Sequence, residues 1–197
     1  MEDKQLTLVE HLSELRRRII IIFLGIIGGS IISYQFVDNI VELLVKPAEK
    51  LEFIYLSPPE LFLAYLKIAI ISGIVISSPI SLMQIWLFIK PGLKPNERKY
   101  LRFGLWMGIV FFLIGVVFAY FTLVPITINF FTEISKNEIA PLFSFDSNLS
   151  FISSILLSSG LVFELPLLII LLTQLNLITA STLTKYRKYV ILVIFII

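Results

Sequence analysis

The sequence contains no cysteine and a single histidine, His11. Without cysteine there is no disulfide, thiol nucleophile or thiolate metal site, and one histidine does not make a metal site. A phosphate-binding glycine loop, an HExxH helix and a serine elbow are also missing from the sequence. Catalysis is therefore the least expected function, and no cofactor is predicted.

Charge is scarce as well, because only 15% of the 197 residues are charged while 57% are hydrophobic. The mean hydropathy of +0.95 is too high for a soluble domain. Four stretches are long and apolar enough to cross a bilayer, and a fifth begins near the end of the chain: residues 19–36, 66–89, 103–124 and 151–175, then 189–197. We predict an all-α polytopic membrane protein with a single integral membrane domain over residues 1–197. Its fifth span has only nine residues, so we expect either a truncated chain or a last segment that is an incomplete or partnered helix.

Basic residues are unevenly distributed along the chain. Twelve of the 16 Lys and Arg fall in residues 1–18, 90–102 and 176–188. Such an excess marks the cytoplasmic side of membrane proteins, which predicts a cytoplasmic or stromal N-terminus. Topology thus explains the basic residues, and we predict no nucleic-acid partner. The first apolar run is long and lacks a small-x-small exit site, so we predict no cleavable leader.

Local patterns predict where several helices begin, end and pack. Residues 1–18 read as an amphipathic interfacial helix that leads into the first span. Residues 37–45 read as a short amphipathic helix on the outer surface, ended by Pro47. Residues 133–150 read as an acidic and polar outer loop. A capping box from Ser57 to Glu60 starts the next helix. Gly25 and Gly29 form a GxxxG pair, which permits close helix packing but is also common by chance.

The second and third spans have the same design. Each exceeds the length that a bilayer requires, and each contains a proline, Pro79 or Pro125, that is expected to bend it. Trp86 and Trp106 are expected at the headgroup level of the cytoplasmic side. Joined by the loop 90–102, the two helices form a hairpin that walls a concave surface.

Two acidic residues lie in unusual surroundings. Glu97 is surrounded by five basic residues in the loop 90–102, so it is either a neutralised bystander or a receptor for a foreign cation. Glu164 lies roughly 20 Å into the fourth span, near the bilayer middle, where a charged carboxylate costs at least a few kcal/mol. It is either a protonated acid that joins helices by hydrogen bonds or a polar contact for a partner helix or substrate.

A series of short motifs runs through the whole chain in order: HLSELRRR at 11–18, Lys46-Pro47, LSPPE at 56–60, SSPISLMQIWLFIKPGL at 77–93, NERK at 96–99, FAYFTLVP at 118–125 and FELP at 163–166. With this series the chain resembles the TatC family, the multispanning receptor of the twin-arginine protein translocase. The resemblance implies a cup-shaped protein of six helices with both termini cytoplasmic, of which this chain carries four complete spans. It also implies binding of signal peptides that carry two adjacent arginines.

The resemblance also assigns roles to individual residues. Glu14 and Glu97 are implied to accept the arginine pair. Arg16, Phe88 and Leu93 are implied to flank that site. Because arginine presents a planar fork that pairs bidentately with a carboxylate, two acids near the interface would distinguish arginine from lysine by geometry.

Pro47 corresponds to an outer-surface position that translocation needs, and Glu164 to an acid on the concave face that is linked to partner helices. The implied partners are signal peptides of folded cargo proteins, single-span TatA/TatB-type subunits and the lipid bilayer, within an oligomeric complex. The implied membrane is a bacterial cytoplasmic membrane or a chloroplast or cyanobacterial thylakoid.

Two other interpretations are considered. The first is a secondary transporter coupled to protons or ions through Glu164, although no inverted repeat is visible in the sequence. The second is a scaffold whose basic loops only hold anionic lipid.

Overall fold

The computed structural model describes residues 8–48, 53–54, 57–90, 98–135 and 143–174. Within these ranges the chain is helical apart from two strands of two residues each, which pair in parallel. The elements in chain order are α1 (Leu8–Gln35), α2 (Val37–Val45), the 3₁₀ turn η1 (Lys46–Ala48), β1 (Phe53–Ile54), α3 (Pro58–Ile89), α4 (Arg98–Phe118), the π-helical turn η3 (Ala119–Leu123), α5 (Val124–Ser135), β2 (Phe143–Ser144) and α6 (Phe145–Gln174).

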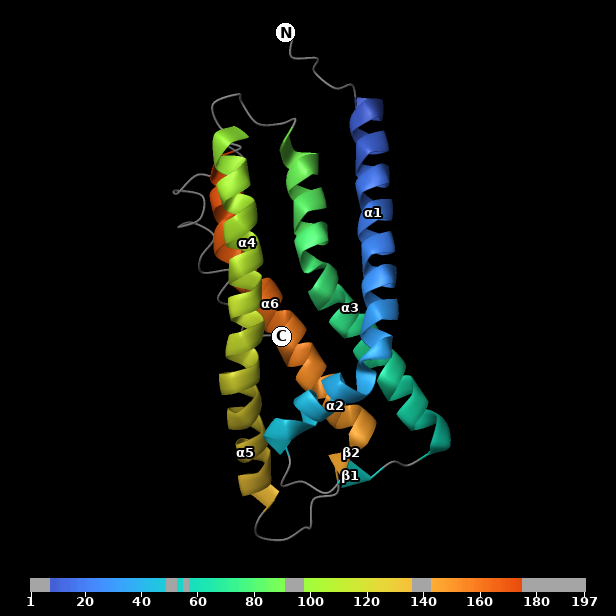
Figure 1. Cartoon of the computed structure of the whole chain (residues 1–197). Helices are drawn as coiled ribbons and strands as arrows, with labels where there is room; N and C mark the ends of the chain where they lie inside the picture. Colours follow the sequence, from blue (N-terminus) through green and yellow to red (C-terminus); the bar gives the residue numbers. More distant parts are fainter. Residues whose placement is uncertain (1–7, 49–52, 55–56, 91–97, 136–142, 175–197) are drawn as a thin grey trace.

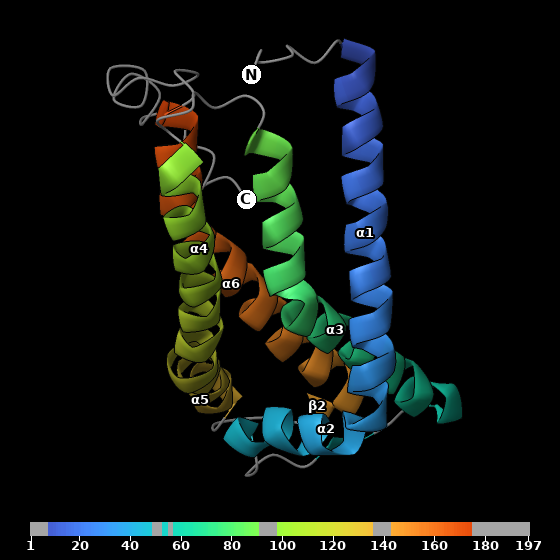
Figure 2. The same cartoon turned by 45° about the horizontal axis from the view of Figure 1, so that its top comes forward.

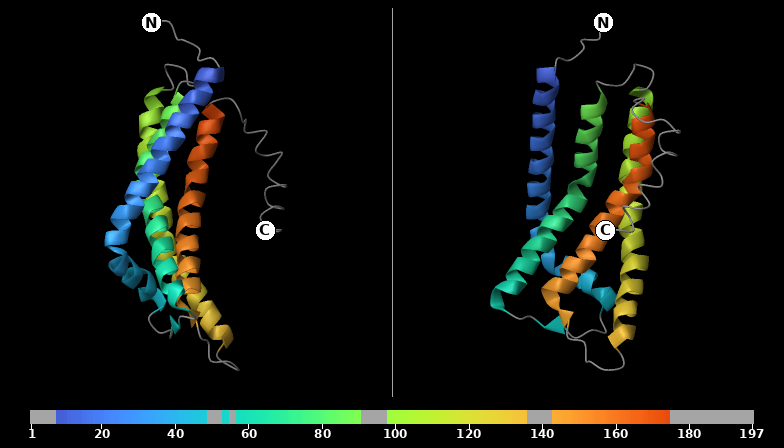
Figure 3. Two further views of the ribbon diagram at one scale, coloured as in Figure 1. Left: turned by 90° about the vertical axis from the view of Figure 1, so that its right-hand side faces the viewer. Right: turned by 180° about the vertical axis from the view of Figure 1, so that it is seen from behind.

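The long helices run between two ends of the molecule (Figure 1). At one end lie the start of α1, the end of α3, the start of α4 and the end of α6; we call this the N-terminal end. At the other, the α2 end, helix α2 lies across the bundle from the foot of α1 towards α5 (Figure 2). Seen edge-on in Figure 3, the helices form a thin, bowed layer.

Within the described ranges, three helical segments are long and apolar enough to cross a membrane, namely α3, the continuous run through α4, η3 and α5, and α6. Helices α1 and α2 together make a fourth candidate, with a bend of 80° between them. The predicted interfacial helix and first span form one continuous helix, α1.

The predicted capping box is present. The Ser57 side chain accepts from the backbone, while the Ser57 backbone N–H donates to Glu60 Oε2 at 3.3 Å. This box and the prolines at the first helical positions start α3 at the predicted residue.

The third and fourth spans differ in detail from the predictions. The irregularity expected at Pro125 is a π-helical turn, Ala119–Leu123, that comes just before it. In a π-helical turn the backbone hydrogen bonds join residues five apart instead of four. This change accommodates Pro125, which has no backbone N–H to donate. Helix α6 begins at Phe145, whereas residues 145–150 were expected in an outer loop. Tertiary contacts hold this first turn, because Lys67 Nζ of α3 lies 2.7 Å from both carboxylate oxygens of Asp146.

Trp86, which was expected at the headgroup level, is buried between helices. Its side chain is only 7% exposed and packs against α4, where a Cβ atom on Gly104 would lie 2.5 Å from the indole ring. Because Gly104 leaves room for the ring, Trp86 becomes a core residue between the two helices. Trp106 is 65% exposed, in keeping with its expected position.

Close helix packing relies on small residues. A Cβ atom on Gly29 would lie 2.7 Å from the carbonyl oxygen of Gly73, so the GxxxG glycine does place α1 directly on α3. Between α4 and α6, the Ser159 hydroxyl donates to the Gly115 carbonyl at 2.9 Å. Gly160 lies against the ring of Phe112 in the same seam.

Most of the buried apolar side chains gather at the α2 end. The larger cluster joins α2, the first part of α3, η3, α5 and the start of α6. At the N-terminal end, the described residues form a smaller cluster around Trp86 and Leu167. Among the described residues, the helices therefore share more buried apolar surface at the α2 end than at the N-terminal end.

Candidate functional site

Helices α1 and α3 bring polar side chains together at the N-terminal end. The Arg18 guanidinium donates through Nη2 to Glu14 Oε1 at 3.1 Å and through Nη1 to Gln84 Oε1 at 2.9 Å. The Glu14 and Arg18 side chains are 24% and 23% exposed, and Gln84 is buried. Arg18 thus links an acid on its own helix to a buried amide on the neighbouring helix.

An aromatic contact adds to this junction one turn nearer the end. The rings of His11 and Phe88 stack with centroids 4.5 Å apart and planes inclined by 21°. His11, Glu14 and Arg18 follow one another at helical spacing on α1. Phe88 follows Gln84 by four residues on α3, so both side chains face α1.

The structure therefore places Glu14 and Phe88 of the predicted site at the same helix junction. Arg16 is exposed on the neighbouring surface of α1. Glu97 and Leu93 lie outside the described residues, but α4, which starts at Arg98, begins at this same end (Figure 1).

Sequence reasoning did not single out Arg18 or Gln84 as parts of this site. The signals were present but weak. Arg18 follows Glu14 by four residues, the spacing of a helical ion pair, and Gln84 is the polar residue within the run SLMQIWLFI. A polar side chain in such a run is expected to face protein.

Glu164 lies in the seam between α4 and α6. A Cβ atom on Gly108 would be 3.3 Å from Glu164 Oε2, so the absent side chain of this glycine makes room for the carboxyl group. Glu164 is half-buried, and its Oε1 is buried without a hydrogen-bond partner in the described ranges. The hydrogen-bonded helix-joining role is thus not seen among these residues.

Pro47 lies in η1 at the α2 end, the opposite end from Glu14. It is half-buried, and Ala48 beside it is buried in the larger apolar cluster. The hydroxyl of Tyr120 donates to the Leu43 carbonyl oxygen at 2.8 Å, which ties α2 to η3. Pro47 therefore terminates a helix that is anchored to the rest of the bundle.

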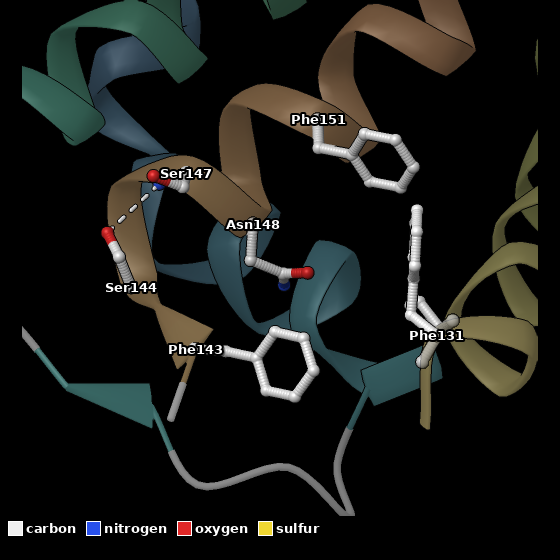
Figure 4. A pocket seen from close by; sticks show the side chains of 7 residues that line it. Phe131, Phe143, Ser144, Ser147, Asn148 and Phe151 are labelled. Atoms are coloured by element: carbon white, nitrogen blue, oxygen red, sulfur yellow. Dashed lines mark hydrogen bonds between the residues drawn. The ribbon is translucent and has the colours of Figure 1, made fainter. Parts of the chain in front are cut away.

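A pocket of about 290 Å³ also lies at the α2 end, between α5 and the start of α6. Figure 4 shows the Asn148 amide pointing into the space between Phe131, Phe143 and Phe151. Asn148 is 8% exposed, and its Nδ2 meets no hydrogen-bond acceptor in the part of the chain that the structure describes. The pocket is therefore aromatic with one buried donor.

Within the described ranges, no three His, Cys, Asp or Glu side chains are grouped closely enough to hold a metal ion.

Comparison with known families identifies the chain. The model of the family described as Sec-independent protein translocase protein (TatC) matches residues 10–197. The chain belongs to the TatC family. This is a family of protein translocase components and not of enzymes, and the transporter interpretation based on Glu164 finds no support in the comparisons.

Relatives in the TatC family come from bacteria and from plastids. The Sec-independent protein translocase protein TatC of Carboxydothermus hydrogenoformans is 43% identical over 198 residues, which cover 100% of this chain and 82% of the relative. The chloroplastic TATC protein of Pisum sativum is 36% identical, with coverage of 96% of this chain and 54% of the relative.

A solved structure shares the fold. The crystal structure of a twin-arginine translocase receptor, TatC, superposes with a TM-score of 0.86 at 33% identity, over 95% of this chain and 85% of that one. The expected TatC-like, polytopic helical fold is thus confirmed, and the chain is an integral membrane protein.

Proposed function

We propose that this TatC-family chain is the receptor subunit of a twin-arginine translocase, and that its N-terminal end binds the twin-arginine signal peptides of folded cargo proteins. The observation that carries the proposal is the placement of Glu14 and Phe88 at one helix junction, at the end where α4 begins directly after Glu97. Membership of a protein translocase family supports it.

The chemistry of the site fits arginine. A guanidinium pairs bidentately with a carboxylate, whereas the lysine ammonium offers only a point charge. An exposed ion pair contributes about 1 kcal/mol or less, but Glu14 is only 24% exposed. A shielded charged hydrogen bond contributes about 1.5–3 kcal/mol, which is roughly tenfold or more in affinity. Glu97 supplies the second acid of the proposed site.

The apolar part of a signal peptide would bind beside these acids. Phe88 and Leu93 flank the acids in the proposal, and the hairpin of α3 and α4 continues the apolar surface into the membrane. Burial of apolar surface contributes about 25 cal/mol per Å², so it adds affinity that the ion pairs lack.

The orientation follows from the charge distribution. We place the N-terminal end in the cytoplasm or stroma, because the basic segments 1–18 and 90–102 lead into the starts of α1 and α4, which lie at that end. The membrane is a bacterial cytoplasmic membrane or a thylakoid, as the two kinds of relatives suggest.

Glu164 is assigned to partner binding. Its Oε1 is buried and has no hydrogen-bond partner among the described residues. A hydrogen bond from another polypeptide would stabilise this oxygen. The partners are proposed to be single-span TatA/TatB-type subunits in an oligomeric complex. Pro47 is proposed to serve translocation from the outer surface, because it ends the anchored helix α2.

The site is tested by photo-crosslinking a twin-arginine signal peptide to membranes that contain the protein. Glu14→Ala and Glu97→Ala are each expected to reduce crosslinking about tenfold or more, while the protein stays inserted. Glu42→Ala is the matched control, because Glu42 is an exposed acid on α2 at the opposite end. Parental crosslinking in both site variants would defeat the assignment.

The role of Glu164 is tested separately by Glu164→Ala. We expect this variant to bind the signal peptide almost as well as the parent but to transport cargo poorly, because the partner contact is lost. Transport is measured as export of a folded reporter. If export continues at the parental rate, Glu164 only joins helices.

A further inference from the structure

Glu14, which is proposed to receive an incoming arginine, already holds an arginine of its own chain. Arg18 Nη2 lies 3.1 Å from Glu14 Oε1, and both side chains are three-quarters shielded from solvent. The guanidinium that Glu14 would select in a signal peptide is thus chemically the same as the group that occupies it.

The internal pair uses only part of the bonding capacity of both groups. Arg18 donates a single hydrogen bond to Glu14 and another to Gln84, and its buried Nε has no acceptor among the described residues. A guanidinium that faces a carboxylate squarely makes two parallel bonds. Glu14 Oε2 accepts no hydrogen bond within the ranges that the structure describes, so an incoming donor has an open oxygen to approach.

Gln84 gives Arg18 a second attachment. Its amide oxygen accepts from Nη1 at 2.9 Å, and the Gln84 side chain is buried between the helices. Arg18 therefore keeps one charged hydrogen bond when it loses Glu14, which lowers the cost of leaving the acid.

We propose that Arg18 is an internal competitor that lowers the affinity of Glu14 for any incoming cation, so that only a guanidinium binds with a net gain. In this exchange, which rests on the proposed function, the guanidinium of the signal peptide pairs with both oxygens of Glu14, and Arg18 stays on Gln84. An arginine of the signal peptide makes two parallel bonds with Glu14, one more than Arg18 makes, and therefore displaces Arg18 from the acid. A lysine only replaces one charged bond with another and gains nothing.

A purely structural Arg18 makes the opposite prediction. If Arg18 only orients Glu14 and joins α1 to α3, its removal leaves the acid poorly placed and weakens peptide binding. If Arg18 competes, its removal frees the acid and strengthens peptide binding. The sign of the change in affinity therefore separates the two roles.

The experiment measures the affinity of the full chain in lipid nanodiscs for a fluorescently labelled twin-arginine signal peptide and for its twin-lysine counterpart. Fluorescence anisotropy at physiological salt gives Kd for the wild type, Arg18→Gln and Arg18→Lys. Arg17→Gln is the matched control, since Arg17 is an exposed neighbour and its loss removes the same charge. The gain in Arg17→Gln measures the effect of net charge alone.

We expect Arg18→Gln to bind the twin-arginine peptide more tightly than Arg17→Gln does, by about tenfold or more, as for the loss of a competing shielded charged hydrogen bond. The twin-lysine peptide should gain affinity by about the same factor, because both peptides displace the same bond between Arg18 and Glu14. The Kd of Arg18→Lys for the twin-arginine peptide should lie between those of the wild type and Arg18→Gln. If Arg18→Gln does not fold, Arg18→Lys decides by itself, because no gain over the wild type overturns the proposal.

Equal gains in affinity for the twin-arginine peptide in Arg17→Gln and Arg18→Gln, or weaker binding in Arg18→Gln, would overturn the competitor role. Glu14→Gln in the same assay tests the underlying function. Weaker binding in Glu14→Gln without a gain in Arg18→Gln leaves the receptor site in place and removes only the competitor. Unchanged binding in Glu14→Gln removes both.

Discussion

Replacing Gly73 with alanine is expected to force α1 away from α3. A Cβ atom at this position would lie 2.5 Å from the backbone nitrogen of Ser30 and 2.7 Å from its Cα atom. The Ser30 hydroxyl is also in the way, and its hydrogen bond to the Ile26 carbonyl oxygen, 2.8 Å long, holds it there. Because the obstructing atoms belong to the backbone, a side-chain rotation does not relieve the clash.

The size of the effect follows from these distances. Ordinary contacts to a Cβ atom start at 3.4 Å, so the two helices must separate by about 0.7–1 Å at Gly73. Overpacking of this kind lowers the free energy of unfolding by about 1–3 kcal/mol. Gln84 lies about 16 Å further along α3, so the same displacement also strains its hydrogen bond with Arg18.

The free energy of unfolding is measured by titrating the protein in mixed micelles with SDS and following far-UV circular dichroism. Gly28→Ala is the control, because a Cβ atom on Gly28 meets nothing within 4 Å. This control should be neutral or slightly more stable, since alanine favours a helix over glycine by about 1 kcal/mol. A Gly73→Ala protein as stable as the parent would refute the close contact between α1 and α3.

Three further changes are assessed by the same titration. Ser159→Ala should lower the free energy of unfolding by about 0.6 kcal/mol, because it removes the buried bond to the Gly115 carbonyl; parental stability would mean that this bond contributes nothing. Lys67→Ala should cost less than about 1 kcal/mol and lose its effect at high salt, since the lysine paired with Asp146 is half exposed; a deficit that persists at 1 M salt would contradict this. Asn148→Leu should raise the free energy of unfolding by about 1–2 kcal/mol, because the buried Nδ2 has no acceptor in the described part of the chain; a loss of stability would show that the amide is bonded.

Features that depend on neighbouring residues were predictable from the sequence. The start of α3 is encoded by Ser57, the following prolines and Glu60, all within one turn, so the helix begins where predicted. The short outer helix followed from its amphipathic spacing, and α2 spans the predicted residues.

Features that depend on a distant segment were predicted incompletely or incorrectly. Trp86 has the local surroundings of an interfacial indole, but the gap left by Gly104 on another helix decides its burial. The start of α6 looked like a polar loop, and the pairing of Asp146 with Lys67 helps to make it helical. Both contacts join residues far apart in sequence, which a local pattern does not register.

The site shows the same division. The motif around Glu14 indicated the acid, and its helical spacing with Arg18 was readable. The contact between Arg18 and Gln84 depends on the relative position of α1 and α3 along their axes. The close approach of Gly29 to Gly73 helps to fix that position. Only one of these two glycines belongs to a sequence motif that suggested close packing.

The concentration of buried side chains at the α2 end has a mechanical consequence. Ile68, in the larger apolar cluster, and Ile89, the last residue of α3, are separated by about 32 Å of helix. A pivot of about 5° around the cluster moves the tip of α3, which contacts α1 through Gln84 and Phe88, by roughly 3 Å, enough to make or break a hydrogen bond. In the proposed function, such a pivot would let the tip of α3 adjust to a bound signal peptide while the apolar cluster at the α2 end stays packed.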